Sequence, residues 1–143
     1  MTRRRHFVAC ALCAALAAAG LGASPAAAQG VGGGPGGGAG PQVTRTTLAT
    51  TDYDERTGTL LAVVEIPAGG IVARHTHPGI ESSYVIEGTS TLLVQGQPDR
   101  QLAPGGGFQI PPGVPHELRN GGAVSKLAVT YVVEKGKPLA TPA

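Results

Sequence analysis

The chain has 143 residues, with 11 Lys and Arg against 9 Asp and Glu. Three of these arginines lie within the first five residues, so the rest of the chain has eight basic and nine acidic side chains and a formal charge of −1. This near-neutral balance lacks the basic patches typical of nucleic-acid binding, and we expect no nucleic-acid partner. Both cysteines, Cys10 and Cys13, lie close to the N-terminus. The remaining chain therefore contains no disulfide and no thiolate metal ligand.

Residues 1–28 are typical of a secretory signal peptide. A basic start, Arg3–Arg5, precedes the apolar run Phe7–Leu21, and Ala26–Ala28 provides the small residues of a cleavage site before Gln29. The arginines also resemble a twin-arginine signal, with an ordinary basic leader as the equal alternative. The apolar run is shorter than the ~20 residues needed to span a bilayer. We expect a periplasmic or secreted protein with no membrane span in its mature form.

Three segments follow the signal peptide. Residues 29–41 are rich in Gly and predict a flexible linker, residues 42–138 form one domain, and residues 139–143 form a C-terminal tail. The domain contains short runs of Val, Leu, Ile and Thr separated by Gly and Pro, which predict an all-β fold. The expected strands are Thr44–Thr50, Thr59–Ile66, Ile71–Thr76, Ser82–Glu87, Thr89–Val94, Phe108–Ile110, His116–Asn120 and Leu127–Val133.

The histidines of the domain have a distinctive spacing. His75 and His77 are two residues apart, which places them on one face of a strand. Glu81 follows after the Pro78-Gly79 bend, and His116 follows a proline-rich turn. Imidazole nitrogen and carboxylate oxygen together suit Fe, Mn, Ni, Cu or Zn. The alternative is three structural histidines, but then all of them would share this spacing by chance.

Two motifs containing these residues resemble those of the cupin superfamily. The first is Gly69, His75, His77, Glu81 and Gly88, and the second is Gly105, Pro111, Gly113, His116 and Asn120. The resemblance covers about residues 60–133, and one departure is Gly106, where the family usually has Asp. It implies a single jelly-roll β-barrel of short antiparallel strands. It also implies one divalent transition metal ion held by His75, His77, Glu81 and His116.

Strand alternation predicts which side chains accompany the metal. If the ligands point inward, so do Ser83, Val85, Phe108, Ile110 and Leu118. We expect them to line an apolar pocket with no fixed positive charge beside the metal. Simple core packing is the alternative for the four apolar residues of this set.

This resemblance leaves two functions open. The first is a metalloenzyme, of oxygenase or related redox type, acting on a small metal-chelating carboxylate or enolate substrate. The second is a non-catalytic envelope protein that binds or senses a metal or small ligand. No catalytic residue is visible outside the ligand set. The strand at Leu60–Val64 is apolar on both faces, which predicts a homodimer, with burial inside one subunit as the alternative.

Overall fold

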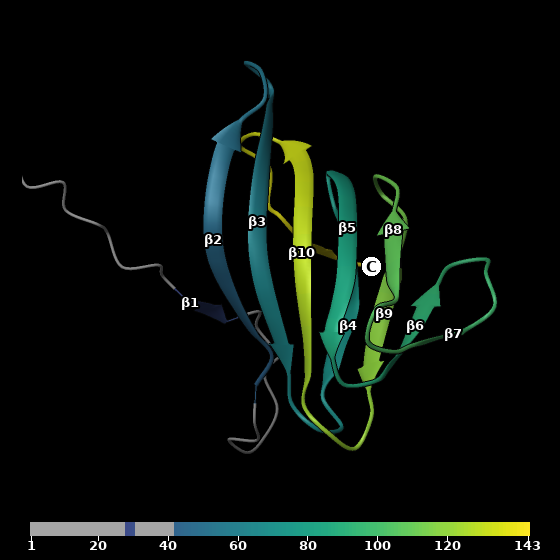
Figure 1. Cartoon of the computed structure of the whole chain (residues 1–143). Coiled ribbons are helices and arrows are strands. Elements are labelled where there is room, and N and C mark those ends of the chain that lie inside the picture. Colours follow the sequence, from purple (N-terminus) through teal and green to yellow (C-terminus); the bar gives the residue numbers. More distant parts are fainter. Residues whose placement is uncertain (1–27, 31–41) are drawn as a thin grey trace, which may run out of the picture.

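The structure is a computed structural model that describes residues 28–30 and 42–143. Every described element is a β-strand (Figure 1). In chain order they are β1 (Ala28–Gly30), β2 (Thr44–Asp52), β3 (Thr57–Ile66), β4 (Ile71–Thr76), β5 (Gly79–Glu87), β6 (Ser90–Val94), β7 (Arg100–Leu102), β8 (Gly107–Ile110), β9 (His116–Asn120), β10 (Ser125–Glu134) and β11 (Thr141–Pro142). Among these residues no helix is long and apolar enough to cross a membrane.

The strands form two antiparallel sheets. One has six strands in the order β1-β2-β3-β10-β5-β8, and the other has five in the order β11-β4-β9-β6-β7. Strands that are neighbours in space are often far apart in sequence, as where β10 pairs with both β3 and β5. This confirms the all-β jelly roll expected from the sequence.

The hydrophobic core lies between the sheets. In β5 the side chains of Glu81, Ser83 and Val85 are buried, while Tyr84 and Ile86 between and after them are exposed. The same alternation buries Phe108 and Ile110 in β8. The core also takes Leu92, Leu102 and Leu118 from the five-stranded sheet. Because the strand period is two, each strand gives one face to the core and the other to the surface.

Glycine permits close contact between β5 and β10 at two positions. Gly88 directly follows β5 with φ of +80°, and a Cβ there would lie 2.2 Å from Ser125 Oγ. Gly79 begins β5, and a Cβ there would lie 2.0 Å from the carbonyl oxygen of Val132 in β10. Both ends of β5 therefore need the absence of a side chain to pair with β10. This pairing fixes the position of Glu81 in the sheet.

Some segments differ from the strands expected above. The structure adds the short strands β7 and β11, and β11 pairs Thr141 with Thr76 and Pro142 with His75. Two- and three-residue strands carry too little alternation to be recognised in sequence. The proposed signal peptide and the linker fall mainly on residues 1–27 and 31–41, which lie outside the described residues. Between these ranges, β1 pairs with β2.

Candidate metal centre

The four predicted ligands come from both sheets and meet in the interior. His75 lies in β4 directly opposite His116 in β9. His77 follows the end of β4, and Glu81 points inward from β5 in the other sheet. One ligand atom from each side chain lies within 4.8 Å of every other. His77, Glu81 and His116 are buried, and His75 is partly buried. His75 and His116, which are 41 positions apart in the sequence, therefore face the same point.

Each imidazole is oriented by a hydrogen bond to the backbone. Nδ1 of His75 lies 2.7 Å from the Ala73 carbonyl oxygen, and Nδ1 of His116 lies 3.0 Å from that of Val114. Nδ1 of His77 lies 2.5 Å from the carbonyl oxygen of Leu139, near the C-terminus. A carbonyl oxygen only accepts, so each Nδ1 carries a hydrogen, and Nε2 is the atom left to bind an ion once it has no proton of its own. This is the arrangement that fixes histidine for metal binding.

The distances between the inward atoms also fit an ion. His75 Nε2 lies 3.1 Å from His77 Nε2, and Glu81 Oε2 lies 2.9 Å from His77 Nε2 and 3.1 Å from His116 Nε2. Two atoms at right angles on an ion with bonds of ~2.1 Å are ~3.0 Å apart. A chelating set of three imidazoles and one carboxylate suits a divalent transition metal. The donors thus fit the metal that the two motifs imply.

The same contacts perturb the protonation of these groups. Burial would raise the pKa of Glu81, but hydrogen bonds from His116, His77 and Ser83 hold that pKa well below its usual value. Burial lowers the pKa of His75 to about 4. Burial also acts to lower the pKa of His116, but its hydrogen bond to Glu81 outweighs this and raises that pKa. At neutral pH Glu81 is therefore an anion and His75 is a neutral ligand.

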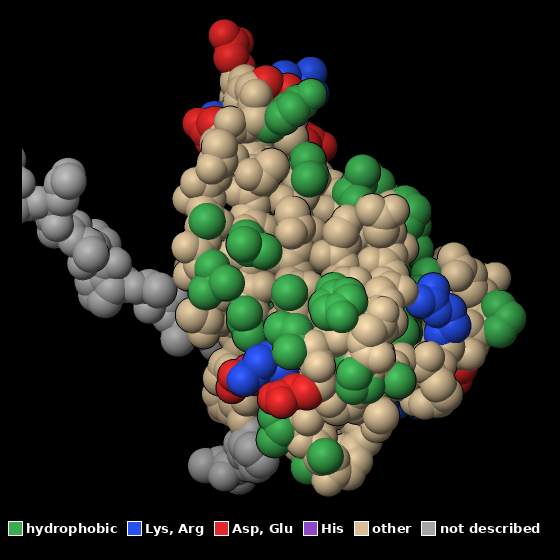
Figure 2. Space-filling view, in the orientation of Figure 1, with side chains coloured by type: hydrophobic (Ala, Val, Ile, Leu, Met, Phe, Trp, Pro, Cys, Tyr) green, Lys and Arg blue, Asp and Glu red, His purple; other side chains and the backbone are tan. Residues whose placement is uncertain are grey.

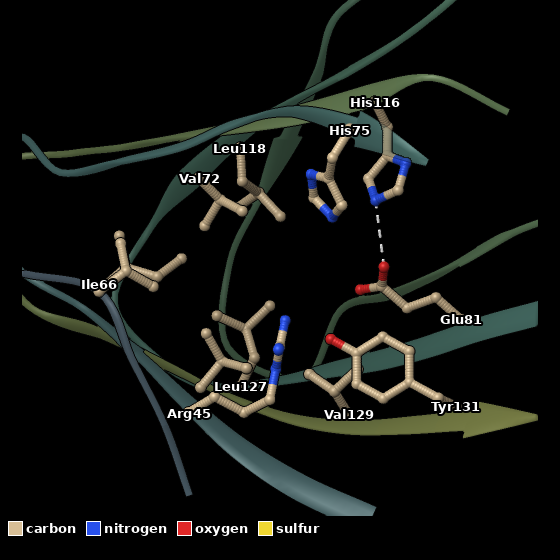
Figure 3. A pocket seen from close by; sticks show the side chains of 12 residues that line it. Arg45, Ile66, Val72, His75, Glu81, His116, Leu118, Leu127, Val129 and Tyr131 are labelled. Atoms are coloured by element: carbon tan, nitrogen blue, oxygen red, sulfur yellow. Dashed lines mark hydrogen bonds and ion pairs between the residues drawn. The ribbon is translucent and has the colours of Figure 1, made fainter. Parts of the chain in front are cut away.

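A small cavity of about 30 Å³ adjoins the centre (Figure 3). Its walls are mainly aliphatic and include Leu118, one of the five pocket residues expected from the sequence. The other four are placed elsewhere. Val85, Phe108 and Ile110 belong to the hydrophobic core, and Ser83 donates a hydrogen bond of 2.7 Å to Glu81 Oε1. Ser83 thus orients a candidate ligand instead of lining the cavity.

Two polar side chains in the cavity were missed by sequence reasoning. Arg45 of β2 and Tyr131 of β10 both line it, and Arg45 is only 8% exposed. The expectation of a pocket without a fixed positive charge is therefore wrong. Arg45 lies 30 residues before the first ligand, so only the pairing of β2 with β3 and of β3 with β10 carries it to the site. Its alternation with Val43 was the one available signal.

Tyr131 is placed beside the centre by sheet register. It pairs with Glu81 across β10 and β5, and its ring centroid lies 4.9 Å from that of His77. Burial and the nearby Glu81 charge raise the pKa of Tyr131. Its hydroxyl therefore keeps its proton at neutral pH and acts as a hydrogen-bond donor toward the cavity.

The motif residue Asn120 holds the fold together at the far end of β9. Its Nδ2 donates to the carbonyl oxygens of Ile66, Pro67 and Ala123 at 2.7–2.8 Å. Its Oδ1 accepts from Ser90 and Ser125. This amide links the end of β9 to the turn after β3 and to the start of β10, so its role is structural.

The architecture and the donor set together define the class of protein. Two antiparallel sheets enclosing a three-histidine, one-carboxylate cluster match the arrangement that the two motifs imply. The sequence model of the family described as Cupin domain matches residues 62–136. The chain belongs to this family.

Individual relatives carry a range of names. The curated dimethylsulfoniopropionate lyase DddQ of Ruegeria pomeroyi is 39% identical over 57 residues, which are 40% of this chain and 28% of that protein. Its crystal structure gives a TM-score of 0.55 at 27% identity, over 59% of this chain and 43% of the lyase. The chain therefore spans less than half the length of this relative.

Two further solved structures extend the similarity over more of the chain. The polyketide cyclase RemF of Streptomyces resistomycificus gives a TM-score of 0.56 at 25% identity, over 71% of this chain and 70% of the cyclase. An RmlC-like cupin of Shewanella frigidimarina gives 0.57 at 22% identity, over 78% and 87%. The last supports the fold alone.

Proposed function

We propose that this protein is a metalloenzyme that binds one divalent transition metal ion through His75, His77, Glu81 and His116. Its substrate is a small carboxylate or enolate that chelates the ion. The observation that carries the proposal is the convergence of four inward ligand atoms, three of them imidazole nitrogens oriented by backbone carbonyls. When bound, such an ion polarises a carboxylate or carbonyl oxygen as a Lewis acid.

The chain's own residues would serve this chemistry in separate ways. Ser83 donates to Glu81 and keeps its carboxylate turned inward. The aliphatic walls of the cavity, including Val72, Leu118 and Val129, exclude water and strengthen electrostatic interactions with a bound substrate. The Tyr131 hydroxyl, which also lines the cavity, offers a hydrogen bond to the substrate.

The metal-binding part of the proposal is tested by elemental analysis. Protein purified from its native host is expected to contain about one equivalent of Fe, Mn, Ni, Cu or Zn per chain. His116→Ala and Glu81→Gln should reduce the bound metal. Arg119→Gln, at an exposed position of β9 whose side chain points away from the centre, is the matched control and should leave it unchanged. Wild-type protein that binds none of these ions tightly at neutral pH would overturn the proposal.

The reaction type is the finer question. From the sequence we expect an oxygenase or related redox enzyme, whereas the named relatives are a lyase and a cyclase. Lyase chemistry needs no change in the oxidation state of the metal. Replacing the native metal by redox-inert Zn²⁺ separates the two. With dimethylsulfoniopropionate as the first compound to test, turnover that persists with Zn²⁺ and without O₂ supports lyase chemistry, and O₂ consumption with the native metal supports an oxygenase.

A non-catalytic binding protein is the second candidate. The cavity supports it because, apart from the candidate ligands, its described lining has only Arg45 and Tyr131 as polar side chains. Such a protein would bind a small ligand reversibly. Recovery of an unchanged co-purified ligand, with no product formed over long incubation, would favour this function.

Export to the periplasm or outside the cell is also proposed, on the sequence of residues 1–28. Replacing Arg4 and Arg5 together by Lys keeps the positive charge and removes the twin-arginine pair. Loss of export would support the twin-arginine route. Unchanged export in this variant, and in cells without that pathway, would point to the general route instead.

A further inference from the structure

The side chain of Arg45 lies in an unusual environment for a guanidinium group. It is 8% exposed, and its Nε has no hydrogen-bond partner among the described residues. It takes no part in the ion pairs that those residues form. A buried charge with no direct ion-pair partner is unfavourable. A functional partner is the natural explanation, because the protein retains this cost next to its metal centre.

Contact with Tyr131 does not satisfy Arg45. The guanidinium carbon lies 5.4 Å from the centre of the Tyr131 ring, which is a cation–π contact. The guanidinium has five N–H donors, and Nε, which carries one of them, has no hydrogen-bond partner among the described residues. Figure 3 shows the guanidinium extending from β2 into the cavity, toward the side where His75 and His116 lie. The guanidinium therefore still has donor capacity for a ligand in the cavity.

The charges around the cavity favour an anion. Glu81 is the only carboxylate among the described lining residues, and Arg45 is the only cation of fixed charge. Their charges cancel, so a divalent ion on the proposed ligands would leave a net charge of +2 in an apolar enclosure. An anionic ligand reduces this charge, and the planar fork of arginine binds carboxylates through two parallel hydrogen bonds.

The size of the cavity limits this anion to a short one. The cavity is narrow, because only about 30 Å³ is open to the centres of water-sized groups, and this favours a short anion over a bulky one. We infer that Arg45 binds the carboxylate of a short substrate whose second oxygen faces the metal centre. This inference rests on the proposed function and names its substrate class: a small carboxylate with a neighbouring oxygen, held between Arg45 and the metal site.

The test compares glycolate with its neutral isostere glycolamide. Binding of each is measured by calorimetry to the Zn²⁺-loaded protein and to the chelator-treated protein. We expect glycolamide to bind the loaded wild type at least about 10-fold more weakly than glycolate, because it cannot form the charge-assisted pair. Arg45→Gln should weaken the binding of glycolate by at least about 10-fold and leave the Zn²⁺ content unchanged. The control Arg119→Gln should bind glycolate like the wild type.

A second readout follows Arg45 itself. In a ¹⁵N-labelled, Zn²⁺-loaded protein, the Nε–H resonance that disappears in Arg45→Lys belongs to Arg45. It should shift on addition of glycolate and not on addition of glycolamide. This measurement uses the wild type, so it holds even if Arg45→Gln does not fold.

Two results would overturn the inference. Equal affinity for glycolate and glycolamide, or glycolate binding that is unchanged in Arg45→Gln, would show that Arg45 is not the carboxylate site. Failure of the proposed function gives a different pattern, in which the wild type takes up no metal at all. The chelator-treated protein distinguishes the two, because a glycolate-dependent shift of the Arg45 resonance there needs no metal.

Discussion

Metal binding should stabilise the folded domain, because the proposed ligands connect the two sheets. His75 and His116 belong to the five-stranded sheet, and Glu81 belongs to the six-stranded sheet. An unfolded chain does not bring together residues that are 35 positions apart, such as Glu81 and His116. The ion therefore binds the folded state almost exclusively and shifts the unfolding equilibrium toward it.

The size of this effect follows from the binding equilibrium. At a free metal concentration 100 times the Kd, stabilisation is about 2.7 kcal/mol. A domain of roughly 100 residues gains about 4–8 °C in Tm per kcal/mol, so metal should raise Tm by about 10–20 °C. His116→Ala removes one of four ligands, and its Tm should respond much less to the same metal concentration.

Differential scanning calorimetry checks this on protein treated with a chelator and then reloaded with Zn²⁺ or Mn²⁺. Ca²⁺ is the control ion, because it prefers all-oxygen sites and should leave Tm nearly unchanged. The reasoning is refuted if reloading does not change Tm in the wild type. It is also refuted if His116→Ala gains as much Tm as the wild type, because the ion would then bind elsewhere.

Three further predictions concern pH, packing and assembly. Metal affinity should fall as pH is lowered, because an imidazole must lose its proton to bind. Because the pKa of His116 is raised above 6.5, protons begin to compete for this ligand above pH 6.5 as pH falls. His75 has a pKa of about 4, so its protonation lowers the metal affinity further only near pH 4. A competition titration with a chromophoric chelator checks the profile, and an affinity that stays constant down to about pH 5 would contradict it. Asn120→Ala should lower the free energy of unfolding by about 2–4 kcal/mol, because it leaves the partly buried carbonyl oxygens of Ile66 and Pro67 without this donor. Urea denaturation measures this loss, and a change under about 0.5 kcal/mol would disprove the structural role given to that amide. The homodimer stays a prediction, and the outer face of the six-stranded sheet offers the apolar surface for it, with Leu61 39% and Tyr84 54% exposed (Figure 2). Light scattering should show a dimer at micromolar concentration that Leu61→Arg dissociates, and a wild-type monomer would rule the dimer out.

Local patterns in the sequence were enough to predict the candidate ligand set. His75, His77 and Glu81 are within seven residues of one another, and the turn before His116 is marked by Pro and Gly. Strand alternation also predicted correctly that Ser83, Val85, Phe108, Ile110 and Leu118 point inward. These properties depend on chain geometry over a few residues, which the sequence encodes directly.

The composition of the cavity was decided by tertiary structure. The packing of the sheets decides which inward-pointing residues reach the cavity, and of the five expected lining residues only Leu118 does. Similarly, the oxygen that orients His77 comes from Leu139, which is 62 residues away in the chain. No local pattern encodes that contact.

Arg45 shows the same distinction most clearly. By itself the sequence presents a charged residue on a strand, which normally points to solvent. The register of β2 on β3 and of β3 on β10 places it inside, in one row with Val64 and Leu127. Register between distant strands is set by the packing of the whole sheet. The sequence by itself therefore determined the fold class and the candidate metal ligands, and only the tertiary structure decided which charge lines the cavity.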